Sequence, residues 1–417
     1  MKQKLFTRDF TMVVLGQIVS LFGNAAVRFA LPLYLLNLTG SSALYGAVTA
    51  CAFIPAILLS PAGGIVADRV NKRNIMVTLD FLTAVLVFVF LLLMDVANLT
   101  ALLTVTLMLL YGIAGAYQPS VQASIPALVS SESFVAANSV INMVSSFSSL
   151  AGPVLGGILY SAYGLRPVLW VCSLCFLFSA VMELFIRIPF TKQPASGGIL
   201  QTARADFAGS LRFIRHERPV IGKTVLVVCA INLFLSAMIV VALPYLITEV
   251  LELGSAQQVN RLYGFAQGLM AAGGLAGGIC TGVLGRRLRV DKAPLTLTAC
   301  ALCPFPMAAA LLFNPGMVSY VILTACCFAG MFFSAIFSVL MISFIHAETP
   351  EGLIGKVISV VLTISMCAQP LGNALYGVLF ELCASFEWAV VLFSGIVSLL
   401  IAFASGRIFR ELPHTAE

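Results

Sequence analysis

The stretch Gly64-Ile-Val-Ala-Asp68-Arg69-Val-Asn-Lys72-Arg73 is a short polar segment between two long apolar runs, 43–67 and 74–95. Each run is long enough to cross a bilayer as a helix, because about 20 apolar residues span the hydrocarbon core. Gly64 permits close helix packing, and Asp68 can accept hydrogen bonds from a neighbouring helix N-terminus. The basic residues after it favour the cytoplasmic side and anionic lipid. The segment therefore predicts a tight turn between two membrane helices.

The composition indicates that such apolar runs make up most of the chain. Of the 417 residues, 60% are hydrophobic and only 10% are charged. So few charges could not cover the surface of a soluble protein, which excludes a cytosolic enzyme, a disordered regulator and a nucleic-acid binder. Twelve runs have spanning length, at 11–36, 43–67, 74–95, 99–124, 137–162, 165–187, 219–248, 258–284, 293–313, 317–345, 356–380 and 386–410. We therefore expect an all-α membrane protein with twelve transmembrane helices.

Basic residues are distributed unevenly over the predicted loops. With the N-terminus inside, all but three of the 23 lysine and arginine residues fall in cytoplasmic segments. Arg166 and Arg261 fall outside, and Arg28 lies within the first span. This asymmetry predicts a multi-pass protein of the cell (inner) membrane with both termini in the cytoplasm.

The longest polar stretch, 188–218, divides the chain into six spans on each side. We expect an N-terminal half at 1–187, a cytoplasmic linker at 188–218 and a C-terminal half at 219–417. Within the linker, 204–217 carries Phe207, Leu211 and Ile214 on one face, with arginines around them. This pattern fits an amphipathic helix on the membrane surface, and equally a solvated linker.

The two halves repeat each other. Ala30-Leu-Pro-Leu-Tyr34 recurs as Ala242-Leu-Pro-Tyr245, and Pro153-Val-Leu-Gly156 has a counterpart in Pro370-Leu-Gly372. Internal duplication of this kind is typical of secondary transporters, whose substrate site lies near the bilayer midplane between the repeats. The sequence therefore predicts two pseudo-symmetric six-helix halves that provide alternating access.

The loop around Asp68, the twelve spans, the central linker and the repeat together resemble the major facilitator superfamily, over essentially the whole chain. The resemblance implies that Gly64, Asp68, Arg69 and Arg73 form a conformational latch that holds the outward-facing state. The second-half copy, Gly282-Val-Leu-Gly-Arg286-Arg287, has no acidic residue at the matching place.

The fifth span carries Ala151-Gly152-Pro153-Val-Leu-Gly156-Gly157, which is similar to the antiporter motif of drug exporters in this family. Proline bends the helix, and the glycines let another helix approach closely. We expect the partner to be the eighth span, through its glycines at 273, 274, 277, 278 and 282. The alternative is an ordinary glycine packing face.

Other stretches resemble the macrolide-efflux-like branch of the family. They are Phe29-Ala-Leu-Pro-Leu-Tyr34, Ala137-Asn-Ser139 and the segment from Thr349 to Val357. Siderophore exporters and lysophospholipid transporters look similar. The arginine that is frequent in the fourth span of drug/proton antiporters is missing, because 107–119 has no charge.

Polar residues form one stripe along the first span. Gln17, Ser20, Asn24 and Arg28 follow one another at steps of 3, 4 and 4, which places them on one helix face. A charge at the centre of a membrane helix costs about 2.5–3.5 kcal/mol on insertion scales, so an arginine there indicates a functional or structural role. We expect the stripe to face a wet cavity, where Arg28 binds an anionic or carbonyl-rich substrate group with Gln17 and Asn24 beside it. The alternatives are snorkelling and a structural pair.

Two acidic residues also lie in spans. Asp80, in the third span, is the candidate for carrying a coupling proton, because burial favours a neutral carboxyl. A structural pairing with Arg69 or Lys72 is the alternative. Glu183 precedes Arg187 by one helical turn, so an interfacial ion pair is expected there.

The family resemblance implies that spans 1, 4, 7 and 10 surround the central cavity. Tyr111 and Gln118 in span 4, Asn232 in span 7, and Phe332 and Ser334 in span 10 are then further candidates for substrate binding. Aromatic rings with sparse amides suit a bulky amphipathic ligand. The alternative for each residue is interhelical hydrogen bonding.

The sequence thus predicts a secondary transporter, not an enzyme, that exports bulky amphipathic compounds such as macrolide-like drugs, with proton coupling. A lysophospholipid or siderophore transporter of the same fold is the alternative. No cofactor or metal site is expected, because the Cys172/Cys175 and Cys300/Cys303 pairs lie in apolar spans without histidine or acidic residues nearby. The expected partners are a small-molecule substrate and membrane lipids, without nucleic acid, and the protein is expected to be a monomer.

Overall fold

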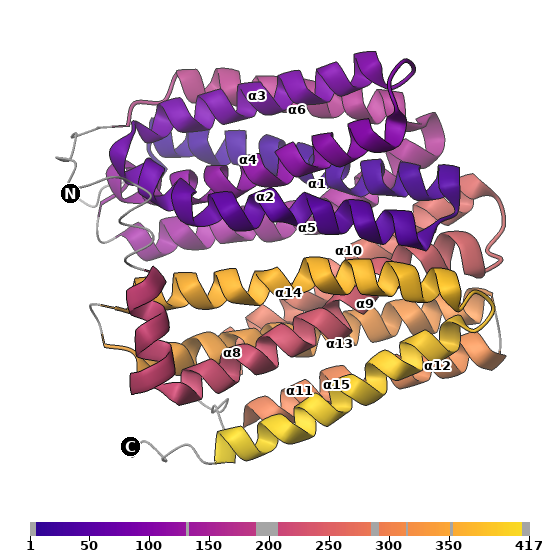
Figure 1. The fold of residues 1–417 in the computed structure, drawn as a ribbon. Coiled ribbons are helices and arrows are strands. Elements are labelled where there is room, and N and C mark those ends of the chain that lie inside the picture. The colour runs from indigo at the N-terminus through magenta and orange to yellow at the C-terminus, as the bar shows by residue number, and fades with distance from the viewer. Residues whose placement is uncertain are drawn as a thin grey trace. The chain divides into compact units, whose positions relative to one another are not determined.

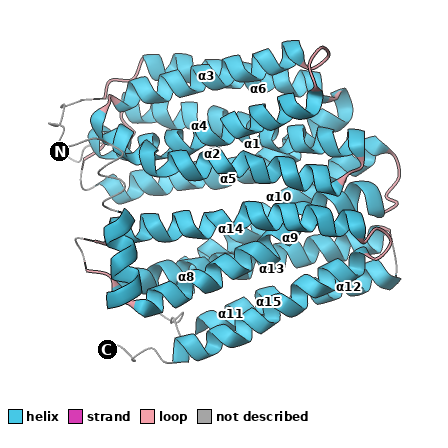
Figure 2. Ribbon diagram, viewed as in Figure 1, coloured by secondary structure: helices cyan, strands magenta, loops and turns pink. Residues whose placement is uncertain are grey.

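A computed structural model describes residues 6–130, 133–188, 207–284, 292–313, 316–350 and 353–410, without the side chains of 60–69, 135, 284 and 407–410. Within these ranges all regular structure is helical (Figures 1 and 2). The fold is therefore all-α, as the apolar runs predict.

Six long helices precede the linker. They are α1 (Arg8–Thr39), α2 (Ser42–Arg69), α3 (Lys72–Leu93), α4 (Leu99–Leu128), α5 (Phe134–Tyr163) and α6 (Leu165–Leu184). Short polar residues set their ends. Asn71 caps α3 by accepting a hydrogen bond from the Arg73 amide at 3.1 Å, and Asn98 caps α4 in the same way. Gly164, at φ 78°, separates α5 from α6 with a backbone conformation that suits glycine.

The helices after the linker are more irregular. The seventh predicted span consists of α8 (Pro219–Ile231), a π-helical turn at Asn232–Ser236, α9 (Ala237–Tyr245) and a second π-helical turn at Leu246–Val250. The ninth is split into α11 (Ala293–Leu302) and α12 (Pro304–Phe313). The remaining helices are α10 (Ala256–Leu284), α13 (Met317–Glu348), α14 (Ile354–Leu382) and α15 (Glu387–Arg410).

Within the described residues, eleven helical segments are long and apolar enough to cross a membrane. They coincide with eleven of the twelve predicted spans. The eighth predicted span, 258–284, is the 29-residue helix α10, which is not among the eleven. Its first turns carry Gln257, Asn260 and Arg261, and polar side chains of this kind lower the hydropathy of a helix. The twelve-span count therefore stays a prediction.

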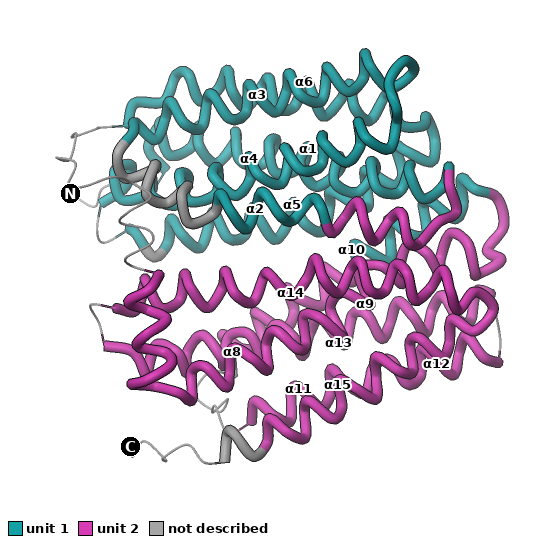
Figure 3. The backbone as a smooth tube through the Cα atoms, viewed as in Figure 1, with its two compact units in different colours: residues 1–38, 51–203, 256–268 teal, residues 39–50, 204–255, 269–417 magenta. Residues whose placement is uncertain are grey.

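The chain forms two compact units, shown in teal and magenta in Figure 3. Unit 1 contains residues 1–38, 51–203 and 256–268, and unit 2 contains residues 39–50, 204–255 and 269–417. Each unit thus takes one short segment from the other half of the sequence. The predicted domain boundaries at 187 and 219 follow the sequence repeat and do not anticipate this exchange.

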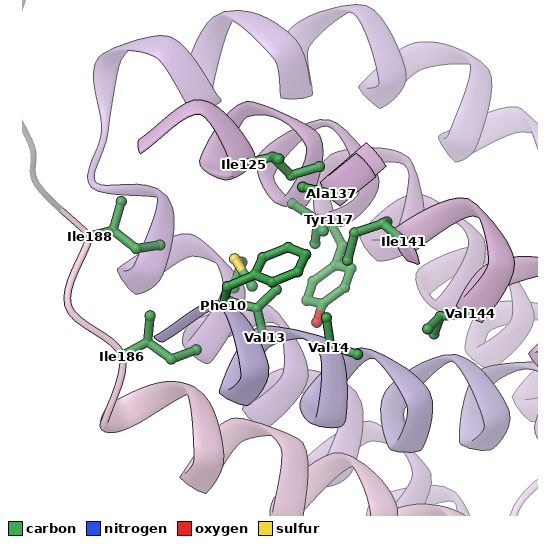
Figure 4. Close-up of a cluster of buried hydrophobic side chains, with 12 residues drawn as sticks. Phe10, Val13, Val14, Tyr117, Ile125, Ala137, Ile141, Val144, Ile186 and Ile188 are labelled. Atoms are coloured by element: carbon green, nitrogen blue, oxygen red, sulfur yellow. The ribbon is translucent and has the colours of Figure 1, made fainter. Parts of the chain in front are cut away.

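Unit 1 is held together by α1, α3, α4, α5 and α6. Helix α3 packs extensively on both α6 and α4. A cluster of buried side chains joins the first turns of α1 to α3, α4, α5 and the segment that follows α6; it includes Phe10, Val13, Ile125 and Ile141 (Figure 4). Burial of each such side chain stabilises the unit by about 1.5–3 kcal/mol relative to exposure in water.

Unit 2 has a comparable cluster that includes the end of the linker. Residues 207–217 are helical, and Phe213 and Ile214 are buried against α8, α13 and α14. Phe207 and Leu211 of the predicted apolar stripe are exposed to 39% and 42%. The linker helix is therefore anchored by its second half, and its contact with a membrane surface stays a prediction.

Candidate functional site

The side chain of Arg28 is half-buried on α1 and lies against α4. Its guanidinium carbon stands 3.8 Å from the centre of the Tyr111 ring, and Nη2 donates to the Leu110 carbonyl at 3.1 Å. The Phe53 ring of α2 packs on Tyr111 with centroids 5.0 Å apart. A cation over an aromatic face is stabilised by about 0.5–2 kcal/mol, which offsets part of the cost of a buried charge. We name Arg28, Phe53 and Tyr111 the Arg28 cluster.

The Arg28 guanidinium retains hydrogen-bonding capacity. Its Nε is buried and has no hydrogen-bond partner. The ion pairs among the described residues join Arg166 to Asp95 and Arg218 to Glu348, so Arg28 is not neutralised by a described carboxylate. A buried, unpaired donor on a charged group is costly, and a ligand that supplies an acceptor would remove that cost. The cluster can thus bind an anionic or carbonyl oxygen beside an aromatic surface.

The predicted polar stripe on α1 faces one helix but has two different surroundings. Gln17 is fully buried, and its Nε2 donates to the Tyr117 hydroxyl at 2.6 Å, whereas Arg28 contacts Leu110 and Tyr111. Both ends of the stripe therefore meet α4. At Gln17, however, α3 and α6 close the space, so the expectation that Gln17 faces a wet cavity is not met. Asn24, between them, is half-buried.

Asp80 and Glu183 are the buried acidic residues of this region. Ser20 donates to Asp80 Oδ1 at 2.8 Å, and the Tyr117 hydroxyl lies 2.8 Å from Glu183 Oε1 and 3.4 Å from Asp80 Oδ2. The expected ion pair between Glu183 and Arg187 is wrong. Glu183 turns inward, while the Arg187 amide donates to Asp9 at 3.2 Å. The sequence spacing allowed the pair, but α6 ends at Leu184, so Arg187 no longer follows the helical register.

The remaining predicted substrate residues have separate surroundings. Gln118 is half-buried on α4. In unit 2, Asn232 donates to the Ser365 carbonyl at 2.9 Å, and the Phe332 ring packs edge-on against Phe333 at 5.3 Å. Ser334 is half-buried on α13. The hydrogen bond of Asn232 fits the interhelical role that was its alternative.

The predicted latch is described only in part, because the side chains of Gly64, Asp68 and Arg69 lie outside the described residues. Arg73 is described. Its Nε donates to the Glu183 carbonyl at 3.4 Å, and its Nη2 donates to the Leu184 carbonyl. Arg73 therefore satisfies the C-terminal carbonyls of α6, a favourable place for a cation.

The antiporter motif packs α5 closely against two other segments of unit 1. A Cβ added at Gly152 would overlap the Cβ of Ala25, and one at Gly156 would lie 3.3 Å from Ala26 Cα. A Cβ at Gly157 would lie 3.0 Å from Gly264 Cα. Pro153 lies inside the helix, next to these contacts.

The expected glycine partners in the eighth span are partly wrong. Gly273 and Gly277 face the backbone of α13 at Phe328 and Phe332. Gly264 and Gly268, nearer the start of α10, face α5 instead. The eighth span does contact α5, but through Gly264 and Gly268, whereas Gly273 and Gly277 contact α13. Glycines spread along one helix can face more than one neighbouring helix.

Replacing Gly152 by alanine should destabilise the protein by about 1–3 kcal/mol, since the added methyl group overlaps Ala25 and α1 must shift. Gly278→Ala is the matched control, because no atom lies within 4 Å of a Cβ there. Thermal unfolding of the two purified variants in detergent measures the difference. Equal melting temperatures would contradict the close α1–α5 contact.

Residues 13–373 match the sequence profile of the Major Facilitator Superfamily. The chain belongs to this superfamily. Together with its eleven apolar helices of spanning length, this family makes the chain a multi-pass membrane protein. Curated relatives include macrolide efflux protein A of Streptococcus pyogenes, 25% identical over 181 residues, which are 43% of this chain and 45% of that protein. The chain thus matches less than half the length of this relative.

Relatives in Citrobacter and Salmonella are named multidrug resistance proteins. Multidrug resistance protein MdtG of Citrobacter koseri is 27% identical over 304 residues, 69% of each chain. The MdtG protein of Salmonella arizonae is 33% identical over 196 residues, 45% of this chain and 46% of the relative.

Solved structures of facilitator-type transporters share the fold. The nucleoside transporter NupG has a TM-score of 0.75 at 13% identity, covering 96% of this chain and 99% of its own. A bacterial homologue of the iron transporter ferroportin, in an inward-facing state, has a TM-score of 0.69 at 19% identity, covering 95% and 98%. At these identities the likeness establishes the fold alone.

Proposed function

We propose that this transporter exports bulky amphipathic compounds, such as macrolide-like drugs, by alternating access across the cell membrane. The Arg28 cluster carries the proposal. It combines a half-buried guanidinium with two aromatic rings, and the buried Nε lacks a partner. A ligand with a ring or alkyl face and an oxygen acceptor matches this arrangement. The relatives named for macrolide efflux and multidrug resistance support the same class of substrate.

The other predicted residues take roles within this proposal. Asn24 and Gln118, half-buried on α1 and α4, extend the substrate contacts of the Arg28 cluster. Asn232, Phe332 and Ser334 are the proposed substrate contacts within unit 2.

Two further roles complete the cycle. Asp80 takes part in binding a coupling proton, and its burial supports that role. Gly64, Asp68, Arg69 and Arg73 form the latch. The glycines and proline of the antiporter motif allow α5 to pack closely against α1.

Uptake into proteoliposomes tests the proposed function. The purified protein is reconstituted, and accumulation of a labelled macrolide inside the liposomes is measured with and without a pH gradient. The gradient is acidic inside, so that protons leave the liposomes as the drug enters. We expect accumulation that requires protein and rises with the gradient. Empty liposomes are the control, and equal uptake in both would reject the exporter.

A transporter of lysophospholipids or siderophores is the second candidate. The unpaired Nε of Arg28 favours it, because phosphate, carboxylate and hydroxamate oxygens are strong acceptors for a guanidinium. Thermal stabilisation by a panel of ligands separates the candidates, since a bound ligand raises the melting temperature by mass action. Stabilisation by the anionic lipid but not by the macrolide would replace the first candidate with the second.

A further inference from the structure

Five polar residues from four helices meet inside unit 1. They are Gln17 and Ser20 of α1, Asp80 of α3, Tyr117 of α4 and Glu183 of α6, and we name them the Tyr117 network. Each exposes between 0% and 5% of its surface. The Tyr117 hydroxyl is the centre, 2.6 Å from Gln17 Nε2, 2.8 Å from Glu183 Oε1 and 3.4 Å from Asp80 Oδ2. One hydroxyl therefore links two buried carboxyl groups.

The charged side chains that the structure describes around the Tyr117 network do not neutralise these carboxyls, and the side chain of Arg69, the alternative partner of Asp80, lies outside the described residues. From α3, Arg73 faces the main-chain carbonyls of Glu183 and Leu184 rather than the Glu183 side chain. From α1, Asp9 accepts from the Arg187 amide. Helix α4 has no charge near Tyr117, since 107–119 is uncharged. Two ionised carboxyls that share one hydroxyl away from water would be strongly unfavourable, so the pair requires a positive partner.

Two acceptor atoms in the Tyr117 network lack a donor. They are Gln17 Oε1 and Glu183 Oε2, both buried and without a hydrogen-bond partner. Asp80 differs, because Ser20 donates to one of its oxygens and Tyr117 approaches the other. The hydrogen bond from Ser20 favours an ionised Asp80, whereas a carboxyl with an unpaired oxygen is the better place for a proton. A proton on Glu183 Oε2 would convert that atom from an unpaired acceptor into a donor.

We propose that the Tyr117 network is a proton-binding site in which Glu183 holds one exchangeable proton beside an ionised Asp80. The Tyr117 hydroxyl lies 2.8 Å from Glu183 Oε1 and 3.4 Å from Asp80 Oδ2, so the acceptor of its single proton depends on which carboxyl is ionised. Four helices of unit 1 contribute, so loss of the proton changes the hydrogen bonds that join them. The proposal rests on the proposed function only in that the bound proton is the coupling ion; the site itself can be tested without substrate.

Infrared difference spectroscopy of the full chain in lipid tests the site, because a protonated carboxyl absorbs apart from a carboxylate. We expect the wild type to show a carboxyl band that disappears reversibly from acidic to alkaline buffer. Glu183→Gln should lose this band. Glu249→Gln, a change at an exposed glutamate, is the matched control and should retain it. Tyr117→Phe, which keeps both carboxyls, should shift the band and provides a second test if Glu183→Gln does not fold.

Three outcomes would overturn the proposal. A titrating band that survives in Glu183→Gln but vanishes in Asp80→Asn would place the proton on Asp80. A band that does not change with pH would make the network purely structural. Loss of the band on adding sodium at constant pH would identify a cation site instead. If transport fails but the band behaves as expected, the exporter is rejected and the proton site stands.

Discussion

Replacing Arg28 by alanine is expected to reduce substrate affinity about tenfold to one hundredfold while the protein stays folded. A hydrogen bond to a charged group contributes about 1.5–3 kcal/mol, and this substitution removes both that bond and the cation over Tyr111. Binding is measured by ligand-dependent thermal shift, and transport is measured in proteoliposomes. The variant should also unfold no earlier than the wild type without ligand, because a costly buried charge is gone.

Two control variants make this result specific. Arg28→Lys keeps the charge but loses the planar, multi-donor head, so it should recover only part of the affinity. Arg166→Ala removes an exposed arginine that pairs with Asp95 and should leave affinity unchanged. Wild-type affinity in Arg28→Ala would remove the Arg28 cluster from the substrate site.

Replacing Asp80 by asparagine is expected to abolish the acceleration of transport by a pH gradient. The amide keeps the size of the side chain and can accept from Ser20, but it removes one of the two carboxyls linked by Tyr117. Without the negative charge of Asp80 beside it, Glu183 ionises more readily and no longer holds the proton. Transport should continue down a substrate gradient and become independent of pH.

Asp95→Asn is the matched control for this second result, since Asp95 is an exposed aspartate. It should retain the response to the pH gradient. An Asp80→Asn protein that still couples uptake to the gradient would show that the proton travels elsewhere.

Much of the fold could be predicted because it depends on local composition. Apolar runs of spanning length become helices in lipid, since the backbone must satisfy its own hydrogen bonds there. The face of α1 was also predictable. Helical spacing placed Gln17 and Arg28 on one side, and both contact α4.

The surroundings of that face could not be predicted, because they depend on which helices close around it. Gln17 is enclosed by α3 and α6, and Arg28 is not. Glu183 was read as half of a local ion pair, although its partner Tyr117 is 66 residues away in the sequence. Phe53 was missed for the same reason, since a single aromatic residue in an apolar run gives no signal of its own. Distant contacts of this kind leave no periodic pattern.

The π-helical turn at Asn232–Ser236 has a consequence for how this chain can vary. A π-helical turn has one residue more than the α-helical turn it replaces. Deleting one position there would therefore let the turn revert to an α-helical turn, and Met238 and Val241, both fully buried, would stay in the core. The same deletion within α9 would instead rotate everything after it by about 100°, because each residue of an α-helix advances by that angle. The π-helical turn is therefore the position in this span where a one-residue change of length is best tolerated.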